Sequence, residues 1–263
     1  MRESNPTNTP LQFKSHVITR DEIEIYDLDV DALPPDYELT IPSELDGRRV
    51  ARLDEHAFAW RRTLKSVVAL AGVRAIGDYA FDNCAALERV VLPTSLESIG
   101  RGAFGNCPSL RKIFIPERVS RVEPTAFWNS PTTIEIDEKN PHFSVESNAL
   151  FDKDKEKFLT LLGGAVPQRV VLPDTVHEIA RGAFRMRQAL SSVLLPEGVE
   201  KIGDYAFHFC SALTSVALRR VISFAHKKLL FYGFLLAFAA LPIYNVEDCS
   251  PLSPHGGARK RKR

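Results

Sequence analysis

Cysteines are the residues of this 263-residue chain whose type and spacing could support chemistry. Cys84, Cys107 and Cys210 each follow a phenylalanine by three residues, and Cys84 and Cys107 are 23 residues apart. No C-x-x-C pair occurs, so the spacing indicates neither a zinc site nor a redox motif. If repeats stack, Cys84 and Cys107 lie about 5 Å apart. We expect buried apolar fillers there, with disulfide or metal chemistry as the alternative.

Other residue types hold the same place elsewhere, namely Arg61, Ser130 and Arg187, which argues against an obligatory thiol. The seven histidines lack metal-like spacing such as H-x-x-x-H. The G-x-S-x-G, P-loop and G-x-G-x-x-G motifs are absent as well. The sequence therefore predicts no catalytic residues, no metal ligands and no cofactor, and a protein that is not an enzyme.

Composition sets the broad class of protein. Hydrophobic residues make up 44% and charged residues 25% of the chain, which is typical of a soluble folded protein. The 34 basic residues nearly balance the 33 acidic ones, so the net charge of +1 gives no overall field to attract nucleic acid. Residues 1–10 are polar, and we see no signal peptide in them.

An internal repeat predicts the elements that position these side chains. The frame I-G-x-x-A-F-x-x-C-x-x-L-x-x-V-x-L-P recurs, for example over residues 73–93, 96–116 and 199–218. Its phenylalanines, mostly spaced by 23 residues, are Phe58, Phe81, Phe104, Phe127, Phe184 and Phe207. The L-x-x-V-x-L-P part predicts a short strand ended by proline, and a second extended piece follows. Ile-Gly then turns the chain, and Ala-Phe fits a single helical turn that buries the phenylalanine. One unit cannot bury this face, but stacked units can.

This motif, over about residues 37–218, resembles the BspA-like leucine-rich repeats, a family found largely in surface proteins of bacteria and some protozoa. The resemblance implies a curved, right-handed β/α solenoid, rich in strands with short helical turns, that serves as a binding or adhesion module. It supplies no catalytic residues. The resemblance also implies a location at the cell surface. The polar N-terminus favours the cytoplasm instead, and both locations stay open.

The pattern divides the chain into a flexible lead (1–10), N-terminal capping strands (11–49), a solenoid (50–218) with an insertion (137–168), and a non-repeat tail (219–263). The tail contains an uncharged apolar segment, 229–244, and a basic end. As a helix this segment spans about 24 Å, short of the roughly 30 Å hydrocarbon core. It is interpreted as a membrane anchor, as a helix over the last repeat, or as a truncated or frame-shifted end.

Strand residues that flank the central apolar position point away from the core. We expect them to form a concave face with an apolar row beside a mildly basic one, which binds a protein or a glycan. The residues predicted to line it are Val68, Arg89, Val91, Lys112, Phe114, Arg169, Val171 and Leu194. The alternative is that β-branched residues merely suit exposed strands.

The predicted function is thus a non-enzymatic, monomeric scaffold of adhesion type that binds no nucleic acid. Two other functions remain open from the sequence. One is a membrane-tethered structural repeat protein, with residues 229–244 as the tether, and the other is a fragment of a longer repeat protein.

Overall fold

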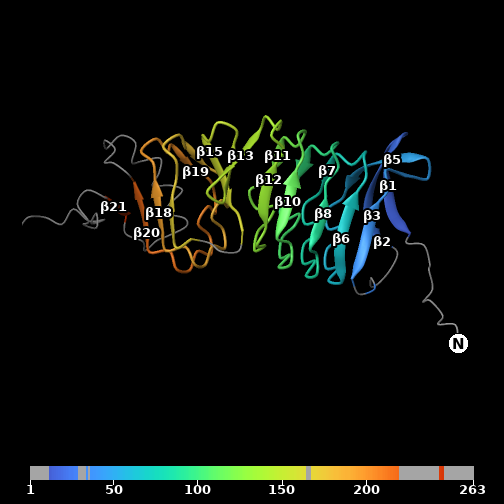
Figure 1. The fold of residues 1–263 in the computed structure, drawn as a ribbon, viewed down its shortest axis with the longest axis horizontal. Coiled ribbons are helices and arrows are strands. Elements are labelled where there is room, and N and C mark those ends of the chain that lie inside the picture. Colours follow the sequence, from blue (N-terminus) through green and yellow to red (C-terminus); the bar gives the residue numbers. More distant parts are fainter. Residues whose placement is uncertain (1–11, 29–33, 35, 164–166, 219–242, 246–263) are drawn as a thin grey trace, which may run out of the picture. The chain divides into compact units, whose positions relative to one another are not determined.

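The computed structural model describes residues 12–28, 34, 36–163, 167–218 and 243–245, which form strands and turns (Figure 1). By internal contacts the chain divides into two units, and each is described by itself. Unit 1 is residues 1–148 with 162–164, and unit 2 is residues 149–161 with 165–263. The described residues include no helix long and apolar enough to cross a membrane.

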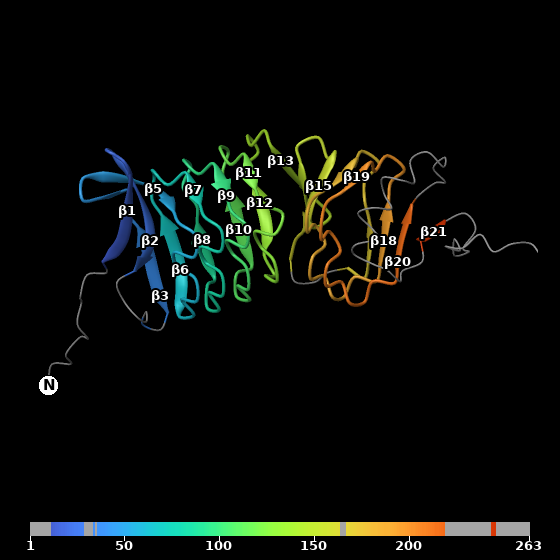
Figure 2. The ribbon, with the colours of Figure 1, turned by 180° about the vertical axis from the view of Figure 1, so that it is seen from behind.

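Unit 1 contains the strands β1 to β13. Their bounds are β1 (Phe13–Thr19), β2 (Glu22–Leu28), β3 (Tyr37–Ile41), β4 (Glu44–Leu45), β5 (Arg48–Leu53), β6 (Leu64–Ala69), β7 (Ala75–Ile76), β8 (Arg89–Val91), β9 (Ser98–Ile99), β10 (Lys112–Ile115), β11 (Arg121–Val122), β12 (Thr133–Ile136) and β13 (Phe143–Glu146). One sheet has the order β1-β2-β5-β7-β9-β11, with β4 paired to β5. The other strands pair as β3-β6-β8 and β10-β12. Figures 1 and 2 show β8 and β10 side by side from both directions.

Unit 2 repeats this two-sided arrangement with the strands β14 to β21. Their bounds are β14 (Ala149–Asp152), β15 (Lys157–Leu161), β16 (Arg169–Val171), β17 (Glu178–Ile179), β18 (Ser192–Leu195), β19 (Lys201–Ile202), β20 (Ser215–Leu218) and β21 (Ile243–Asn245). One sheet contains β14-β15-β17-β19, and the other has the order β16-β18-β20-β21. Strands of successive repeats are parallel in both sheets.

The short strands follow directly from the repeat. In β10, Ile113 and Ile115 are buried while Lys112 and Phe114 are exposed, as alternation along a strand requires. Pro116 follows at once, and it lacks the N–H that a longer ladder would need. A 23-residue period keeps the strands β18 and β20 in the same register, so they pair without a shift.

The predicted phenylalanines form the centre of the core in both units. In unit 1 the rings of Phe58, Phe81, Phe104 and Phe127 stack with centroids 5.2, 5.4 and 5.6 Å apart. In unit 2 the rings of Phe184 and Phe207 stack at 4.9 Å. All of these side chains are buried, and within each stack neighbouring rings cover one another. The leucine-rich-repeat solenoid that the sequence predicts is confirmed.

The Ala-Phe segments are turns, and not the short helical turns expected from the sequence. Tyr79 and Asn83, on either side of Phe81, have left-handed φ angles of 56° and 61°. The N–H groups of Tyr79 and Phe81 donate to the carbonyls of Arg101 and Ala103 in the next repeat, each at 2.8 Å. Only alternate N–H groups, such as that of Asp82 to the carbonyl of Tyr79, bond along the segment, so a continuous helical ladder does not form.

The N-terminal strand-like runs form β1, β2 and β3. β1 is antiparallel to β2, and β2 is parallel to β5, so the hairpin extends one sheet of unit 1. In the predicted insertion, β14 and β15 form an antiparallel pair. Phe158 of β15 stacks on Phe184 at 4.6 Å and so extends the ring stack of unit 2.

The predicted lead (1–10) and most of the predicted tail lie outside the described residues. Residues 219–242 of the tail, which include most of the apolar segment 229–244, are among them. Within the described part of the tail, β21 pairs parallel to β20.

Candidate binding face

The outward side of the longer strands carries the residues predicted to bind a partner, and we call it the strand face. In unit 1 its ladders bring Thr40, Val68 and Val91 into one row across β3, β6 and β8. On β10, the neighbour of β8, Phe114 is outward-facing and is aligned with Glu135 of β12. The predicted apolar residues of unit 1 therefore occupy equivalent positions on neighbouring strands.

Phe114 is the most prominent apolar residue of the strand face. Its side chain is 47% exposed, that of Val91 is 36% exposed, and Val68 is half-buried. An exposed aromatic ring on a strand is a candidate contact for a partner, because its burial on binding would be favourable. Val68, Val91 and Phe114 thus form an apolar strip on unit 1.

Unit 2 has its own strand face on β16, β18 and β20. Val171, Leu194 and Ala217 are aligned in one row by the parallel ladders. Val171 is 47% exposed, whereas Leu194 is half-buried. Arg169, aligned with Ser192, is exposed beside this row. The predicted residues of unit 2 are therefore also accessible together.

Beside the apolar row of unit 1, a second row of outward residues contains the predicted basic residues. It is less basic than the sequence suggests. Arg89 and Lys112 are exposed, but Lys112 Nζ lies 2.6 Å from Glu135 Oε1 on the neighbouring strand. Both side chains of this pair are more than half exposed. Glu38 of β3 shares a row with Ser66 and Arg89 and adds a further negative charge.

Sequence reasoning missed two residues of this face, Glu38 and Thr40, and one ion pair. Glu38 and Thr40 were assigned to the N-terminal capping segment, although the parallel pairing of β3 with β6 makes them part of the strand face. Apolar and polar residues alternate in their segment, YELTIP, as they do in the repeat strands. This alternation was the signal that could have placed them on the strand face. Glu135 matters through its ion pair with Lys112, which depends on strand adjacency and has no signature in the sequence.

The repeated cysteines make a specific hydrogen bond that the sequence did not suggest. The thiols of Cys84, Cys107 and Cys210 each donate to the carbonyl oxygen of the phenylalanine 26 residues earlier, at 3.2, 3.2 and 2.9 Å. Ser130 Oγ makes the equivalent bond to Phe104 at 2.7 Å. Arg187 likewise donates to the carbonyl of Leu161, also 26 residues earlier. The place therefore requires a donor, and thiol, hydroxyl and guanidinium each supply one.

The thiols themselves are poorly suited to chemistry. Cys84, Cys107 and Cys210 are buried and free, so the predicted burial is confirmed and no disulfide joins them. Burial raises the pKa of Cys107 to about 12 and that of Cys210 to about 11. Burial also raises the pKa of Cys84 well above its ordinary value. The thiolate is the form of cysteine that acts as a nucleophile or binds metals, and a raised pKa keeps these thiols protonated. We therefore assign them a structural role.

The stacked repeats, the parallel short strands and the phenylalanine stack define a leucine-rich-repeat solenoid. The chain belongs to the BspA type leucine-rich repeat family, which matches residues 48–160 and 167–235 with six copies of the repeat.

Solved structures share the fold. A chain described as the pneumococcal vaccine antigen PcpA is 17% identical, with a TM-score of 0.58 over 80% of this chain and 71% of that one. A leucine-rich repeat protein from Eubacterium ventriosum is 19% identical, with a TM-score of 0.50 over 75% of this chain and 67% of that one. A comparison with curated proteins found no match. At these identities the likeness shows the fold alone.

Proposed function

We propose that this chain is a non-enzymatic scaffold that binds a protein or glycan partner through its strand face. The observation that carries the proposal is the exposed side chain of Phe114 on β10, the neighbour of the strand β8 that carries Val91. Stacked repeats present extended surfaces of this kind, and repeat proteins use them for recognition. Exposed apolar strips rimmed by polar residues commonly mark interaction sites.

In the proposed site the apolar row supplies contact area and the other row supplies polar contacts. Phe114 is the anchor, because aromatic side chains contribute much contact area for little loss of conformational entropy. In unit 1, Val91 and Val68 would exclude water around the partner, and Arg89 and Lys112 supply polar contacts that set orientation more than affinity. In unit 2, Val171, Leu194 and Arg169 would form a separate patch of the same kind. Partners with acidic or hydroxyl-rich surfaces fit this composition.

A binding comparison between two phenylalanine variants tests the proposal. Purified wild-type protein is screened on a glycan array and against candidate surface proteins of the source organism. Any partner found is then measured with Phe114→Asp, which places a charge in the apolar strip. Binding should fall by at least tenfold, equivalent to about 1.4 kcal/mol.

Phe209→Asp is the matched control. Phe209 is 59% exposed, so the same substitution alters a similarly accessible ring. It lies in a turn with a left-handed φ of 59°, a conformation that aspartate tolerates. Retained binding by Phe209→Asp and lost binding by Phe114→Asp supports the strand face, whereas full binding by Phe114→Asp contradicts it.

Adhesion at a cell surface is the form of this proposal that the family favours. One structural neighbour is described as a vaccine antigen, which fits a surface-exposed protein. A membrane-impermeant biotin reagent applied to intact source cells should label the protein, and absence of label would contradict surface exposure.

Light scattering should give a monomer near 29.4 kDa, and a larger mass would contradict the monomeric scaffold.

A further inference from the structure

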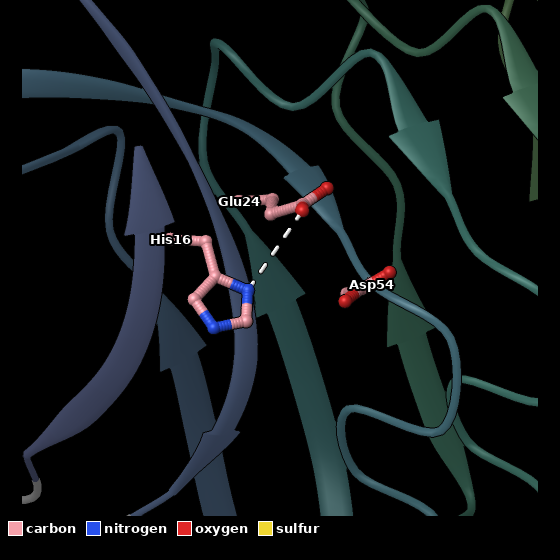
Figure 3. Close-up of side chains that lie close together, drawn as sticks. All are labelled: His16, Glu24 and Asp54. Carbon is pink, nitrogen blue, oxygen red and sulfur yellow. Dashed lines mark ion pairs between the residues drawn. The ribbon is translucent and has the colours of Figure 1, made fainter. Parts of the chain in front are cut away.

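A second group of side chains converges in unit 1, away from the strand face. His16 of β1, Glu24 of β2 and Asp54 directly after β5 face one another (Figure 3). One potential ligand atom from each residue lies within 4.8 Å of the other two. This group combines an imidazole with two carboxylates and comes from three separate segments of chain.

The sheet itself brings these residues together. His16 and Glu24 are direct partners in the antiparallel pair of β1 and β2. The backbone N–H of Asp54 donates to the carbonyl of Ile25 at 2.8 Å, so Asp54 is tied to the strand that carries Glu24. Backbone hydrogen bonds therefore hold each of the three Cα atoms in place. Because the backbone is already ordered, binding of a ligand costs little backbone entropy.

The side chains are also oriented by specific contacts. The imidazole of His16 stacks on Tyr26 with centroids 4.2 Å apart and planes 18° apart, and its Nδ1 lies 4.0 Å from Glu24 Oε1. Asp54 Oδ1 accepts a hydrogen bond from the Glu55 N–H at 2.7 Å, which restrains the carboxylate. These contacts act on His16 and Asp54 independently of each other.

We propose that His16, Glu24 and Asp54 form a zinc-binding site. Zinc takes imidazole nitrogen and carboxylate oxygen at about 2.0–2.2 Å, and three protein ligands with a water complete its tetrahedral coordination. In tetrahedral coordination two ligands at that distance lie about 3.3–3.6 Å apart, so the ligand atoms, now within 4.8 Å of one another, move closer by up to about 1.5 Å around the ion. His16, with its side chain 60% exposed, makes this movement by rotation.

Arg52 determines how tightly the site binds the ion. Its Nε lies 3.8 Å from Glu24 Oε2, so the guanidinium competes with the metal for the same carboxylate. The interaction is long and half exposed to solvent, and such ion pairs are weak. A zinc ion therefore displaces Arg52 from Glu24 at modest cost, and removal of the Arg52 charge tightens binding.

Calorimetric titration of the full-length, untagged chain with zinc chloride tests the site. Wild-type protein should bind one zinc ion with saturation. His16→Ala and Asp54→Asn should each weaken binding by at least tenfold, while Arg52→Gln should strengthen it. Thermal unfolding without metal should be similar for all variants, because these side chains are at the surface.

His56→Ala is the matched control. The His56 side chain is 56% exposed, lies 3.6 Å from Glu55 and stacks on Tyr79 at 5.0 Å. It thus has the same type of surroundings as His16, but no third ligand joins it among the described residues. Unchanged zinc binding by His56→Ala with loss in His16→Ala supports the site. Equal binding by wild type and His16→Ala, or no saturation in wild type, overturns it.

Discussion

The repeat position three residues after the phenylalanine is occupied by cysteine, serine or arginine. The hydrogen bond that each donates to a carbonyl of the preceding repeat explains why this position accepts such different residues. Cys107 donates to Phe81, and Ser130 donates to Phe104 in the same way. A buried carbonyl without a donor loses the hydrogen bond it had to water in the unfolded chain. At the residue scale, we therefore expect this position to need a hydrogen-bond donor of any size, with apolarity alone insufficient.

Substitution of Cys107 separates these two requirements. Cys107→Ser keeps a donor for the Phe81 carbonyl, whereas Cys107→Ala leaves that carbonyl unpaired at a cost of about 1–3 kcal/mol. Urea denaturation should therefore rank Cys107→Ser as more stable than Cys107→Ala. If the alanine variant is the more stable one, the thiol acts as an apolar filler and the bond is unimportant.

Thiol reactivity should depend on unfolding and on strongly alkaline pH. Burial raises the pKa of Cys107 to about 12 and that of Cys210 to about 11, so the neutral thiol is favoured in the folded state. This contribution to stability is complete below the ordinary thiol pKa and is lost as pH rises through these values. With Cys249→Ser to remove the remaining cysteine, a disulfide reagent at about pH 8 should label native protein slowly and unfolded protein rapidly. Rapid labelling of native protein would contradict the burial.

At the scale of elements, the phenylalanine stack runs through the core of unit 1 from repeat to repeat. Phe104 is covered by Phe81 on one side and Phe127 on the other. Phe104→Ala should reduce the free energy of unfolding by about 3–5 kcal/mol, because it opens a cavity between two rings. Phe114→Ala, the same change at an exposed ring, should stay within about 0.5 kcal/mol. Equal losses in chemical denaturation would contradict the stacked core.

The repeat pattern was sufficient to predict the short strands, their proline ends and the buried phenylalanines, because most repeats keep the 23-residue period. It was insufficient for the turns, since the choice between a helical turn and hydrogen bonds to the next repeat depends on a neighbour that the local sequence does not contain. Phe158 illustrates the same limit, because it joins the stack from an insertion without the Ala-Phe motif.

The candidate sites show this limit more strongly. Phe114 could be placed on an outward strand position from alternation alone. The ion pair of Lys112 with Glu135 required knowledge of which strands are adjacent. The group of His16, Glu24 and Asp54 has no linear spacing, because two strands and a turn each supply one residue.

At the scale of the whole molecule, charge is nearly balanced, with a net charge of +1. Because the proposed anchor is apolar and Lys112 is paired with Glu135, binding of the partner should depend only weakly on salt. Between about 50 and 200 mM sodium chloride we expect a change in affinity far below the 10³–10⁵-fold loss typical of proteins that neutralise many phosphates. A loss of that size would indicate a polyanionic partner and a different surface.

Hydroxyl-radical footprinting of the wild-type complex tests the central claim most directly. Phe114, Trp60, Tyr205 and Phe209 are all exposed aromatic residues, but of these only Phe114 belongs to the strand face. Bound partner should protect Phe114 from oxidation and leave the three turn residues as reactive as in the free protein. Protection of Trp60, Tyr205 or Phe209 with unchanged oxidation of Phe114 would contradict recognition through the strand face.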